Sequence, residues 1–227
     1  LRMKALTEGC RALLYYCAGQ VDRGNCGDEA AKNRAEIIVP LLKAWGTDIG
    51  VEVASLGIQI HGGMGFVEET GAAQHWRDSR IAPIYEGTNG IQAADLVTRK
   101  LGLDGGEAMI SLFETIAREA AGERTLATLA EDCAGIARWM QGEASLDDRL
   151  AGSVPFCTMA AVCVAGWQLM KQAAAVAAGA APALAESKPV TVRFFLDRVV
   201  PEALGLKAGA VAGADLLYAL PAEKLAG

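Results

Sequence analysis

Glu86 stands out because of its neighbours, in the run Tyr-Glu-Gly-Thr-Asn-Gly at residues 85–90. A tyrosine on one side and a glycine on the other give its carboxylate an apolar wall and an open approach. Desolvation in such a place raises the pKa of a carboxyl group towards working pH, as a base that removes a weakly acidic C–H proton requires. The alternative, simpler from the residues alone, is an ordinary turn carboxylate, with Thr88 or Asn89 capping the helix that begins near Gly90.

A second candidate is the run Gln-Ile-His-Gly-Gly-Met-Gly-Phe at residues 59–66. Glycines let the backbone take positive φ and bring bare N–H groups close to a ligand, as pyrophosphate-binding loops require. The run matches neither the G-x-G-x-x-G fingerprint nor a Walker loop, and no strand is predicted before it, which disfavours a dinucleotide-binding fold of that type. The run therefore has two interpretations: a turn that ends a helix, or a loop that binds a phosphate group.

Residues 61–90 show no sustained hydrophobic period and are predicted to be rich in loops. Within them, Arg77, Asp78 and Arg80 are expected to form ion pairs that hold the loop in place. His75 is expected to be a hydrogen-bonded structural residue. His61, beside the glycine pair, is a weaker candidate for a ligand contact.

Helical periodicity surrounds this segment and predicts the elements that must position it. Met3, Leu6, Cys10, Leu13 and Cys17 mark an amphipathic helix at residues 2–20. The next expected helix runs from about Asn33 or Ile38 to Ile60, with Pro40 in its first turns, since a proline further inside would break it. The helices expected after that one lie at 91–101, 107–121, 124–142, 146–178 (bent or started near Pro155), 187–204 and 208–219. The fold class is therefore all-α. The glycines at residues 102–106 are expected to separate two helical units.

The composition argues against several classes of protein. The 227 residues carry a net charge of −6 without a basic run, which argues against nucleic acid or an anionic membrane as the main partner. Six cysteines without a C-x-x-C pair or a Cys/His cluster are expected to be reduced core residues of a cytoplasmic protein, with no metal site. The apolar stretch at 154–170 is interrupted by Pro155 and Gly166 and is expected to be a buried helix.

The run from Gln59 to Gln92 resembles the C-terminal signature of the acyl-CoA dehydrogenase family. It joins the glycine-rich turn and the Tyr-Glu-Gly-Thr motif over more than thirty consecutive positions. The resemblance implies that residues 1–103 form the family's C-terminal helical domain. Residues 104–227 resemble the additional helical domain of the larger members, which include bacterial long-chain and 3-methylmercaptopropionyl-CoA dehydrogenases.

The resemblance also implies roles for individual residues. Glu86 occupies the position of the catalytic base, and Tyr85 and Gly87 flank it as substrate-binding residues. The cofactor-binding positions, which would contact FAD, are Gln59, Gly62, Gly63 and Thr88. No metal is implied.

The implied reaction is oxidation of an acyl-CoA to a trans-2-enoyl-CoA in fatty acid metabolism. The implied partners are an electron-transfer flavoprotein and further copies of the chain, in a dimer or tetramer. Because the family also uses an N-terminal helical domain and a middle β-domain, this chain is expected to be a fragment that is inactive alone. The alternatives are a non-catalytic helical interaction module, an acyl-CoA oxidase, and a tail that associates with membranes.

Overall fold

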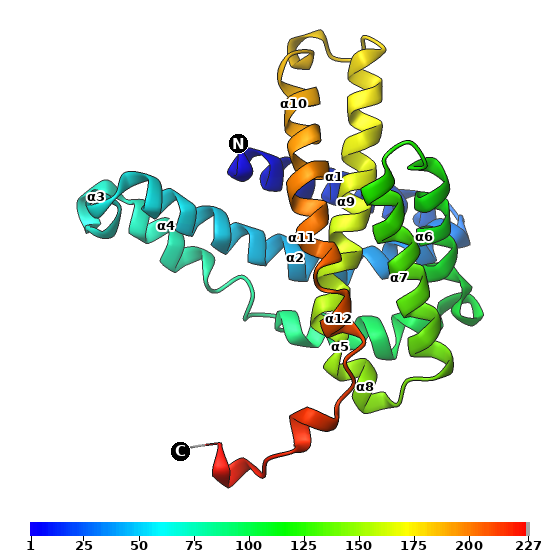
Figure 1. Ribbon diagram of the computed structural model, residues 1–227. Coiled ribbons are helices and arrows are strands. Elements are labelled where there is room, and N and C mark those ends of the chain that lie inside the picture. The colour runs from blue at the N-terminus through cyan, green and yellow to red at the C-terminus, as the bar shows by residue number, and fades with distance from the viewer. Residues whose placement is uncertain (226–227) are drawn as a thin grey trace.

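The computed structural model describes residues 1–225, which form helices and turns without a strand, so the all-α prediction is confirmed (Figure 1). Its first five helices carry or flank the candidate residues. They are α1 (Arg2–Asn25), α2 (Glu29–His61), α3 (Gly63–Phe66), α4 (Ala72–Ser79) and α5 (Asn89–Thr98), with 3₁₀ turns at Glu68–Thr70 and Lys100–Gly106.

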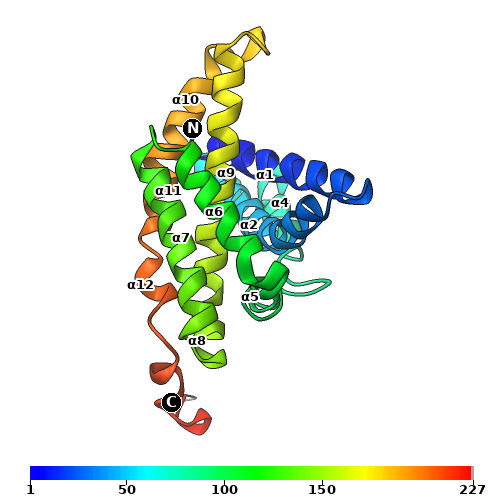
Figure 2. The same cartoon turned by 90° about the vertical axis from the view of Figure 1, so that its right-hand side faces the viewer.

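The remaining helices form two hairpins that lie side by side (Figures 1 and 2). The first hairpin is α6 (Glu107–Glu119) with α7 (Arg124–Gly142). After the short α8 (Leu146–Ala151), the second pairs α9 (Ser153–Ala177) with the run of α10 (Ser187–Phe194), a π-helical turn (Phe195–Val199) and α11 (Val200–Leu204). The chain then continues through α12 (Lys207–Ala210) and 3₁₀ turns at Asp215–Tyr218 and Ala222–Lys224; a further 3₁₀ turn, Pro182–Leu184, joins α9 to α10.

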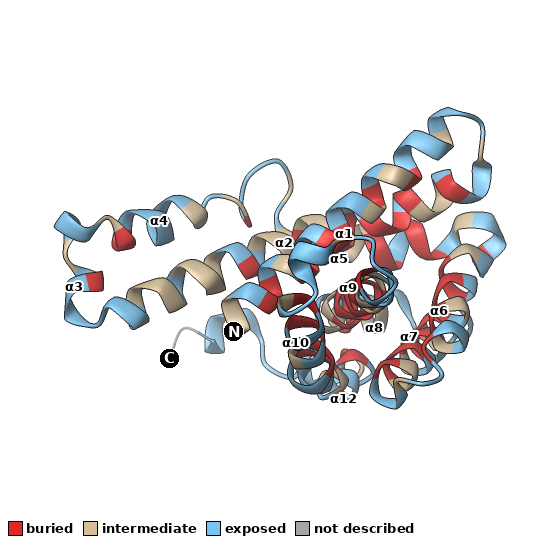
Figure 3. Ribbon diagram, turned by 90° about the horizontal axis from the view of Figure 1, so that it is seen from above, coloured by how far each residue is buried: buried red, intermediate tan, exposed pale blue. Residues whose placement is uncertain are grey.

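Helix α9 is the centre of the core (Figure 3). It packs against α1, α2 and α5 on one side and against α7 and α10 on the other, so one hydrophobic core joins both halves of the chain. Small residues allow this crowding: a Cβ on Gly166 would lie 3.2 Å from Leu126 Cδ1. Helix α9 is long and apolar enough to cross a membrane, but 72% of its most apolar window is buried. The prediction of a buried helix is confirmed.

Helix α2 departs from the prediction at its start. Asp28 caps it by accepting a hydrogen bond from the Ala31 N–H at 2.9 Å, so the helix begins before Asn33. Pro40 consequently lies deep inside the helix rather than in its first turns, which corrects the sequence prediction. The helix continues through the proline because Pro40 and its neighbours Ile37 and Leu41 are buried, and this packing offsets the missing backbone hydrogen bond.

Two other expectations are corrected, and a third is confirmed. The segment after α2 is not only loop, because α4 is a regular helix of eight residues. The helix predicted at 146–178 is expected to bend or start near Pro155, and this is confirmed, because α9 starts at Ser153. The break lies at Gly152, where a Cβ would lie 2.1 Å from the Ala210 carbonyl oxygen. The predicted helix at 208–219 ends after α12: Gly213 takes φ +77°, and the Asp148 carboxylate accepts from the Ala214 N–H at 2.9 Å.

The cysteines follow the prediction except for one. None of the six forms a disulfide within residues 1–225. Cys17, Cys133, Cys157 and Cys163 are buried and Cys10 is half-buried, and burial raises the pKa of the Cys157 thiol to about 12. Cys26 is exposed because it lies in the turn between α1 and α2.

The second half of α2 leaves the core together with α3 and α4, and these three form an arm that projects from the body (Figure 1). All the buried residues of α2 lie between Ala31 and Ile49. Beyond them the helix contacts α1 near Glu52 and Val53 and then runs beside α3 and α4, where apolar residues such as Ile60 and Phe66 are exposed. The arm therefore carries the glycine-rich turn away from the body.

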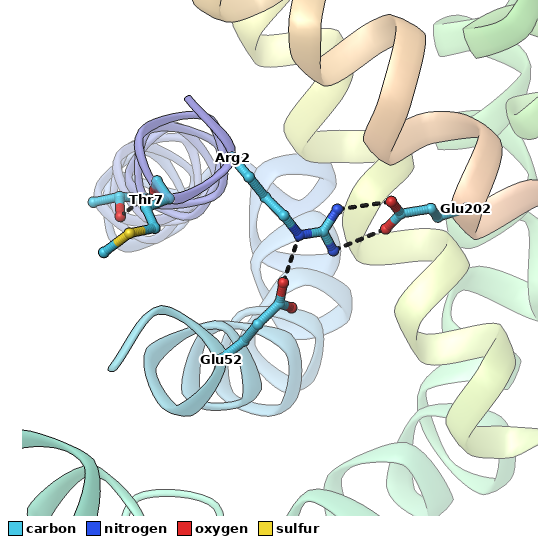
Figure 4. Close-up of polar contacts among 5 residues, drawn as sticks. Arg2, Thr7, Glu52 and Glu202 are labelled. Carbon is cyan, nitrogen blue, oxygen red and sulfur yellow. Dashed lines mark hydrogen bonds and ion pairs between the residues drawn. The ribbon is translucent and has the colours of Figure 1, made fainter. Parts of the chain in front are cut away.

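Ion pairs connect the N-terminal helices to the last part of the chain. Arg2 donates to Glu52 of α2 at 2.7 Å and to both carboxylate oxygens of Glu202 of α11 at 2.7 and 2.9 Å (Figure 4). Lys188 of α10, which is buried, donates to Glu8 of α1 at 2.6 Å. The Arg2–Glu202 and Lys188–Glu8 contacts join residues that are 200 and 180 positions apart.

The Lys188–Glu8 pair gives a stability prediction. We expect Glu8→Gln to lower the free energy of unfolding at pH 7 by on the order of 3 kcal/mol, because Lys188 would keep a buried charge without its counter-charge. Chemical denaturation of wild type and variant measures the difference. As a control, Glu29→Gln removes one member of an exposed pair (3.5 Å to Lys32) and should change stability by less than about 0.5 kcal/mol.

The same pair predicts the pH dependence. Burial raises the pKa of the Glu8 carboxyl, but hydrogen bonds from Lys188 and Lys4 outweigh this, so the pKa lies below its usual 4.5. A depressed pKa stabilises the fold above the unfolded-state value and loses that contribution as pH falls through the folded-state value. The gap between wild type and Glu8→Gln should therefore be constant above pH 4.5 and close below it. Equal stability of the two proteins at pH 7 would contradict this account.

Candidate functional site

Glu86 lies on the loop between α4 and α5, in an unusual backbone conformation. Its φ is +50° and that of Gly87 is +92°, so two successive residues are left-handed. For a residue with a Cβ this conformation costs about 1–2 kcal/mol and is kept only where surrounding contacts enforce it. The loop is therefore a defined structure rather than a loose connection.

Lys43 of α2 provides the main contact that enforces this turn. Its Nζ donates to the carbonyl oxygens of Tyr85 (3.1 Å), Glu86 and Gly87 (2.8 Å). The ammonium group also lies 5.9 Å from the centroid of the Tyr85 ring, within the range of a cation–π interaction. One side chain thus binds three successive peptide carbonyls of the candidate loop.

One turn further along α2, a second set of hydrogen bonds fixes the start of α5. The Asn89 side-chain amide donates to the Ala44 carbonyl at 3.0 Å and to Asp48 at 2.8 Å, and it accepts from the Thr47 hydroxyl at 3.0 Å. Burial raises the pKa of the Asp48 carboxyl, although the Asn89 hydrogen bond opposes the shift. The loop is held by α2 on both sides of Thr88.

Thr88 caps α5, as the simpler interpretation of the motif allowed. Its hydroxyl oxygen accepts from the Ile91 N–H at 3.3 Å. This contact uses a lone pair of the hydroxyl, and no described residue accepts the hydroxyl proton. A contact of Thr88 with the flavin side of a cofactor stays a prediction.

The Glu86 carboxylate is exposed, and it makes no hydrogen bond or ion pair within residues 1–225. Tyr85 beside it is 51% exposed. The desolvated surroundings expected from the sequence are therefore not provided by this part of the chain, because none of its helices covers the loop on the Glu86 side. The substrate-binding roles of Tyr85 and Gly87 likewise stay predictions.

The glycine-rich turn ends α2 as predicted. Gly62 takes φ +60°, and its N–H donates to the Gln59 carbonyl at 3.1 Å. A Cβ on Gly65 would lie 2.2 Å from the Ile58 carbonyl oxygen, so Gly65 is required for α3 to pack against α2. Gly63 differs from both, because it lies in helical backbone and a Cβ there would meet no atom within 4 Å.

Contacts within the arm test the remaining expectations. Within residues 1–225 the side chains of His75, Asp78 and Arg80 make no hydrogen bond or ion pair, so the contacts expected of them are not found there. Arg77 forms a two-pronged ion pair at 2.8 Å, but with Glu68 rather than with Asp78, and it lowers the pKa of the Glu68 carboxyl. His61 and His75 both line a groove of about 520 Å³ between α2 and α4. The His61 ring nitrogen Nδ1 is hydrogen-bonded to the Gly57 carbonyl at 2.8 Å, which gives that histidine a structural partner.

The two candidate groups do not form one site. Lys43, beneath the Glu86 loop, and Gln59, before the glycine turn, lie sixteen residues apart on one helix, which corresponds to about 24 Å. The structure brings Tyr85, Glu86, Gly87 and Thr88 together and places Gln59, Gly62 and Gly63 at the far end of α2. Lys43, Thr47 and Asp48 were missed by sequence reasoning. The available signal was a cluster of polar residues in an otherwise apolar part of the helix.

Comparisons with known proteins match both halves of the chain. Residues 1–101 match the family described as "Acyl-CoA dehydrogenase, C-terminal domain", and residues 109–221 match "Acetyl-CoA dehydrogenase C-terminal like". The chain is 43% identical to 3-methylmercaptopropionyl-CoA dehydrogenase of Ruegeria pomeroyi, over 89% of this chain and 38% of the relative. It is 30% identical to the broad-specificity linear acyl-CoA dehydrogenase FadE5 of Mycobacterium tuberculosis, over 88% and 38%.

The fold is that of solved family members. The crystal structure of an acyl-CoA dehydrogenase complexed with FAD from Bacillus anthracis superposes with a TM-score of 0.74 over 94% of this chain and 42% of that one, at 19% identity. Caenorhabditis elegans ACDH-11 in complex with C11-CoA superposes with a TM-score of 0.61, at 20% identity, over 98% and 36%. The chain spans about 38% of the length of these two curated relatives.

The glycine turn gives a paired prediction. Gly65→Ala should destabilise the arm by several kcal/mol or displace α3, because a Cβ at 2.2 Å from a backbone oxygen forces the backbone to move. Gly63→Ala should leave stability unchanged or raise it by about 0.4–1 kcal/mol, since its backbone is helical and the space is open. Thermal unfolding, with amide exchange across residues 57–79, distinguishes the two, and equal effects would refute the assignment.

Proposed function

The chain belongs to the acyl-CoA dehydrogenase family, and from this we propose that it is the C-terminal part of an FAD-dependent enzyme that oxidises an acyl-CoA to a trans-2-enoyl-CoA. The observation that carries the proposal is the Glu86 carboxylate, exposed and without an ion pair, on a left-handed turn that α2 holds in place. An ordinary turn glutamate has no need of such an anchored conformation.

Glu86 performs the proton transfer in this proposal. Its carboxylate takes the proton from Cα of the thioester, and the electron pair of that C–H bond forms the Cα=Cβ bond. FAD, when bound, accepts the hydride that leaves Cβ. The Glu86 backbone N–H, which has no acceptor within residues 1–225, donates to the thioester carbonyl and stabilises the negative charge that develops there.

The glycine turn fits a cofactor contact. Neither the backbone conformation nor the packing of the described chain requires a glycine at position 63, and the space beside its Cα is open. Close approach of a bound ligand would explain why this residue has no side chain. Gln59, whose side-chain amide has no partner among the described residues, would hold the adenosine pyrophosphate part of FAD together with Gly62 and Gly63.

The separation of the two sites supports an oligomer. About 24 Å along α2 lies between the Glu86 loop and the glycine turn, so the arm is suited to contact an FAD other than the one beside Glu86. We therefore propose a homo-oligomer, a dimer or a tetramer, in which the arm reaches the flavin of a neighbouring copy. Exposed apolar residues on the arm, among them Phe66 at 82% exposure, are consistent with such a contact.

The remaining proposals concern the acceptor and the compartment. We propose a cytoplasmic enzyme that passes its electrons to an electron-transfer flavoprotein. The acyl-CoA oxidase alternative shares the base and the flavin, and oxygen consumption without an added acceptor would favour it. The interaction-module alternative requires neither a strained Glu86 nor an open Gly63, and the family match together with these features disfavours it.

Glu86→Gln tests the base. In the complete polypeptide with FAD, we expect a suitable acyl-CoA to bleach the flavin absorption of the wild type, and the variant to lose bleaching by at least about 10²-fold, because an amide cannot take the proton. Stopped-flow spectroscopy with a panel of acyl-CoAs measures the rate. Glu131→Gln, at an exposed glutamate of α7, is the control and should behave as wild type. Unchanged bleaching in Glu86→Gln would sink the assignment.

The isolated chain tests whether the activity requires the parts of the protein that this chain lacks. We expect residues 1–227 alone to bind FAD weakly and to show no turnover with acyl-CoA and an artificial electron acceptor. The reason is that the Glu86 loop lies open to solvent, without the walls that would exclude water from the reaction. Turnover by this polypeptide without any added chain would overturn the prediction.

A further inference from the structure

The Lys43 ammonium group makes an unusual set of contacts. It has no carboxylate partner within residues 1–225, whereas other lysines of the chain, such as Lys32 with Glu29, pair with carboxylates. Its partners are instead three carbonyl oxygens from successive residues, Tyr85, Glu86 and Gly87. An ammonium group has three N–H donors, so the loop uses the full capacity of this side chain.

These contacts fix the direction of the loop's N–H groups. In a trans peptide the carbonyl of one residue and the N–H of the next point in opposite directions. Because the carbonyls of residues 85–87 face Lys43, the N–H groups of Glu86, Gly87 and Thr88 face away from α2. None of these three N–H groups has an acceptor within residues 1–225, which agrees with an outward orientation.

We propose that Lys43 is a positioning residue for the reaction: it holds Glu86 in its left-handed conformation and turns the adjacent N–H groups towards the thioester. This inference rests on the proposed role of Glu86 as the base. The ammonium charge also polarises the three peptide groups, which strengthens their N–H groups as donors to a developing negative charge. Without it, three converging carbonyl dipoles would repel one another, and the turn would relax.

The experiment uses the complete FAD-containing polypeptide with Lys43→Met, Lys43→Arg and, as control, Lys32→Met. Lys32 lies on the same helix in an exposed pair, so its loss should not affect the loop. In Lys43→Met we expect the bleaching rate at saturating acyl-CoA to fall by about 10²-fold, as a misplaced group causes. Binding of a non-reactive thioester analogue should change by less than about tenfold, because the loss falls on the chemical step rather than on ground-state binding.

Lys43→Arg distinguishes the effect of the positive charge at residue 43 from the effect of its hydrogen-bond geometry. Its planar guanidinium retains the charge but cannot direct three donors to carbonyls that converge on one point, so we expect a rate between those of wild type and Lys43→Met. A direct structural measurement is the amide exchange of Tyr85 and Asn89, which donate to the Ile81 and Pro83 carbonyls within the loop. Both amides should exchange faster in Lys43→Met and at the wild-type rate in Lys32→Met.

The outcomes distinguish this inference from the proposed function. If the wild type bleaches and Lys43→Met bleaches at the same rate, the positioning role is wrong while the role of Glu86 stands. Unchanged exchange of the Tyr85 and Asn89 amides overturns the inference whatever the bleaching shows. If the wild type itself does not bleach with any acyl-CoA, the proposed function fails, and the inference, which rests on it, fails too.

Discussion

The burial of the first half of α2 is the constraint on which the site depends. Residues between Ala31 and Ile49 pack into the core against α1, α5 and α9, which fixes the helix in position and direction. From that fixed half, Lys43 and Asp48 reach the loop before α5. The other half extends out as the arm and carries the glycine turn. One rigid element of 33 residues therefore sets where both candidate groups lie.

The second half of the chain packs against α1, α2 and α5 and so holds the first half of α2 in place. Helix α9 fills the space beside α1, α2 and α5, and its small residues let the helices approach closely. The Arg2 and Lys188 ion pairs connect the first helix to the last ones. Because these contacts cross between the two family matches, the additional helices are part of the same core rather than a separate appendage.

The site also shows what the rest of a full-length protein has to supply. Glu86, the free N–H groups beside it and the open Gly63 all face away from the chain's own core. Polar groups without partners are stable here because water satisfies them. In a closed site the same groups would be left for substrate and cofactor. An ordered but uncovered loop of this kind is what one part of a shared active site has to provide.

The sequence alone determined the fold class, the end of α2, the bounds of α7 and the identity of the candidate residues. Helical periodicity located α7 at its observed bounds, and the glycine pair marked the end of α2, because both signals are local. The resemblance over residues 59–92 named the family, which the comparisons confirm. The short helices α3 and α4 were not predicted from the sequence, because they depend on packing against α2.

Only the tertiary structure decided which residues act together. Lys43 lies 42 residues before Tyr85, and nothing local to either one indicates their contact. The burial of Pro40 inside a continuous helix, the different needs of Gly63 and Gly65, and the exposure of Glu86 likewise follow from what surrounds each residue in space. Periodicity reports how a segment interacts with itself, whereas hydrogen bonds across 40 positions and the space around a Cβ exist only once the helices have packed.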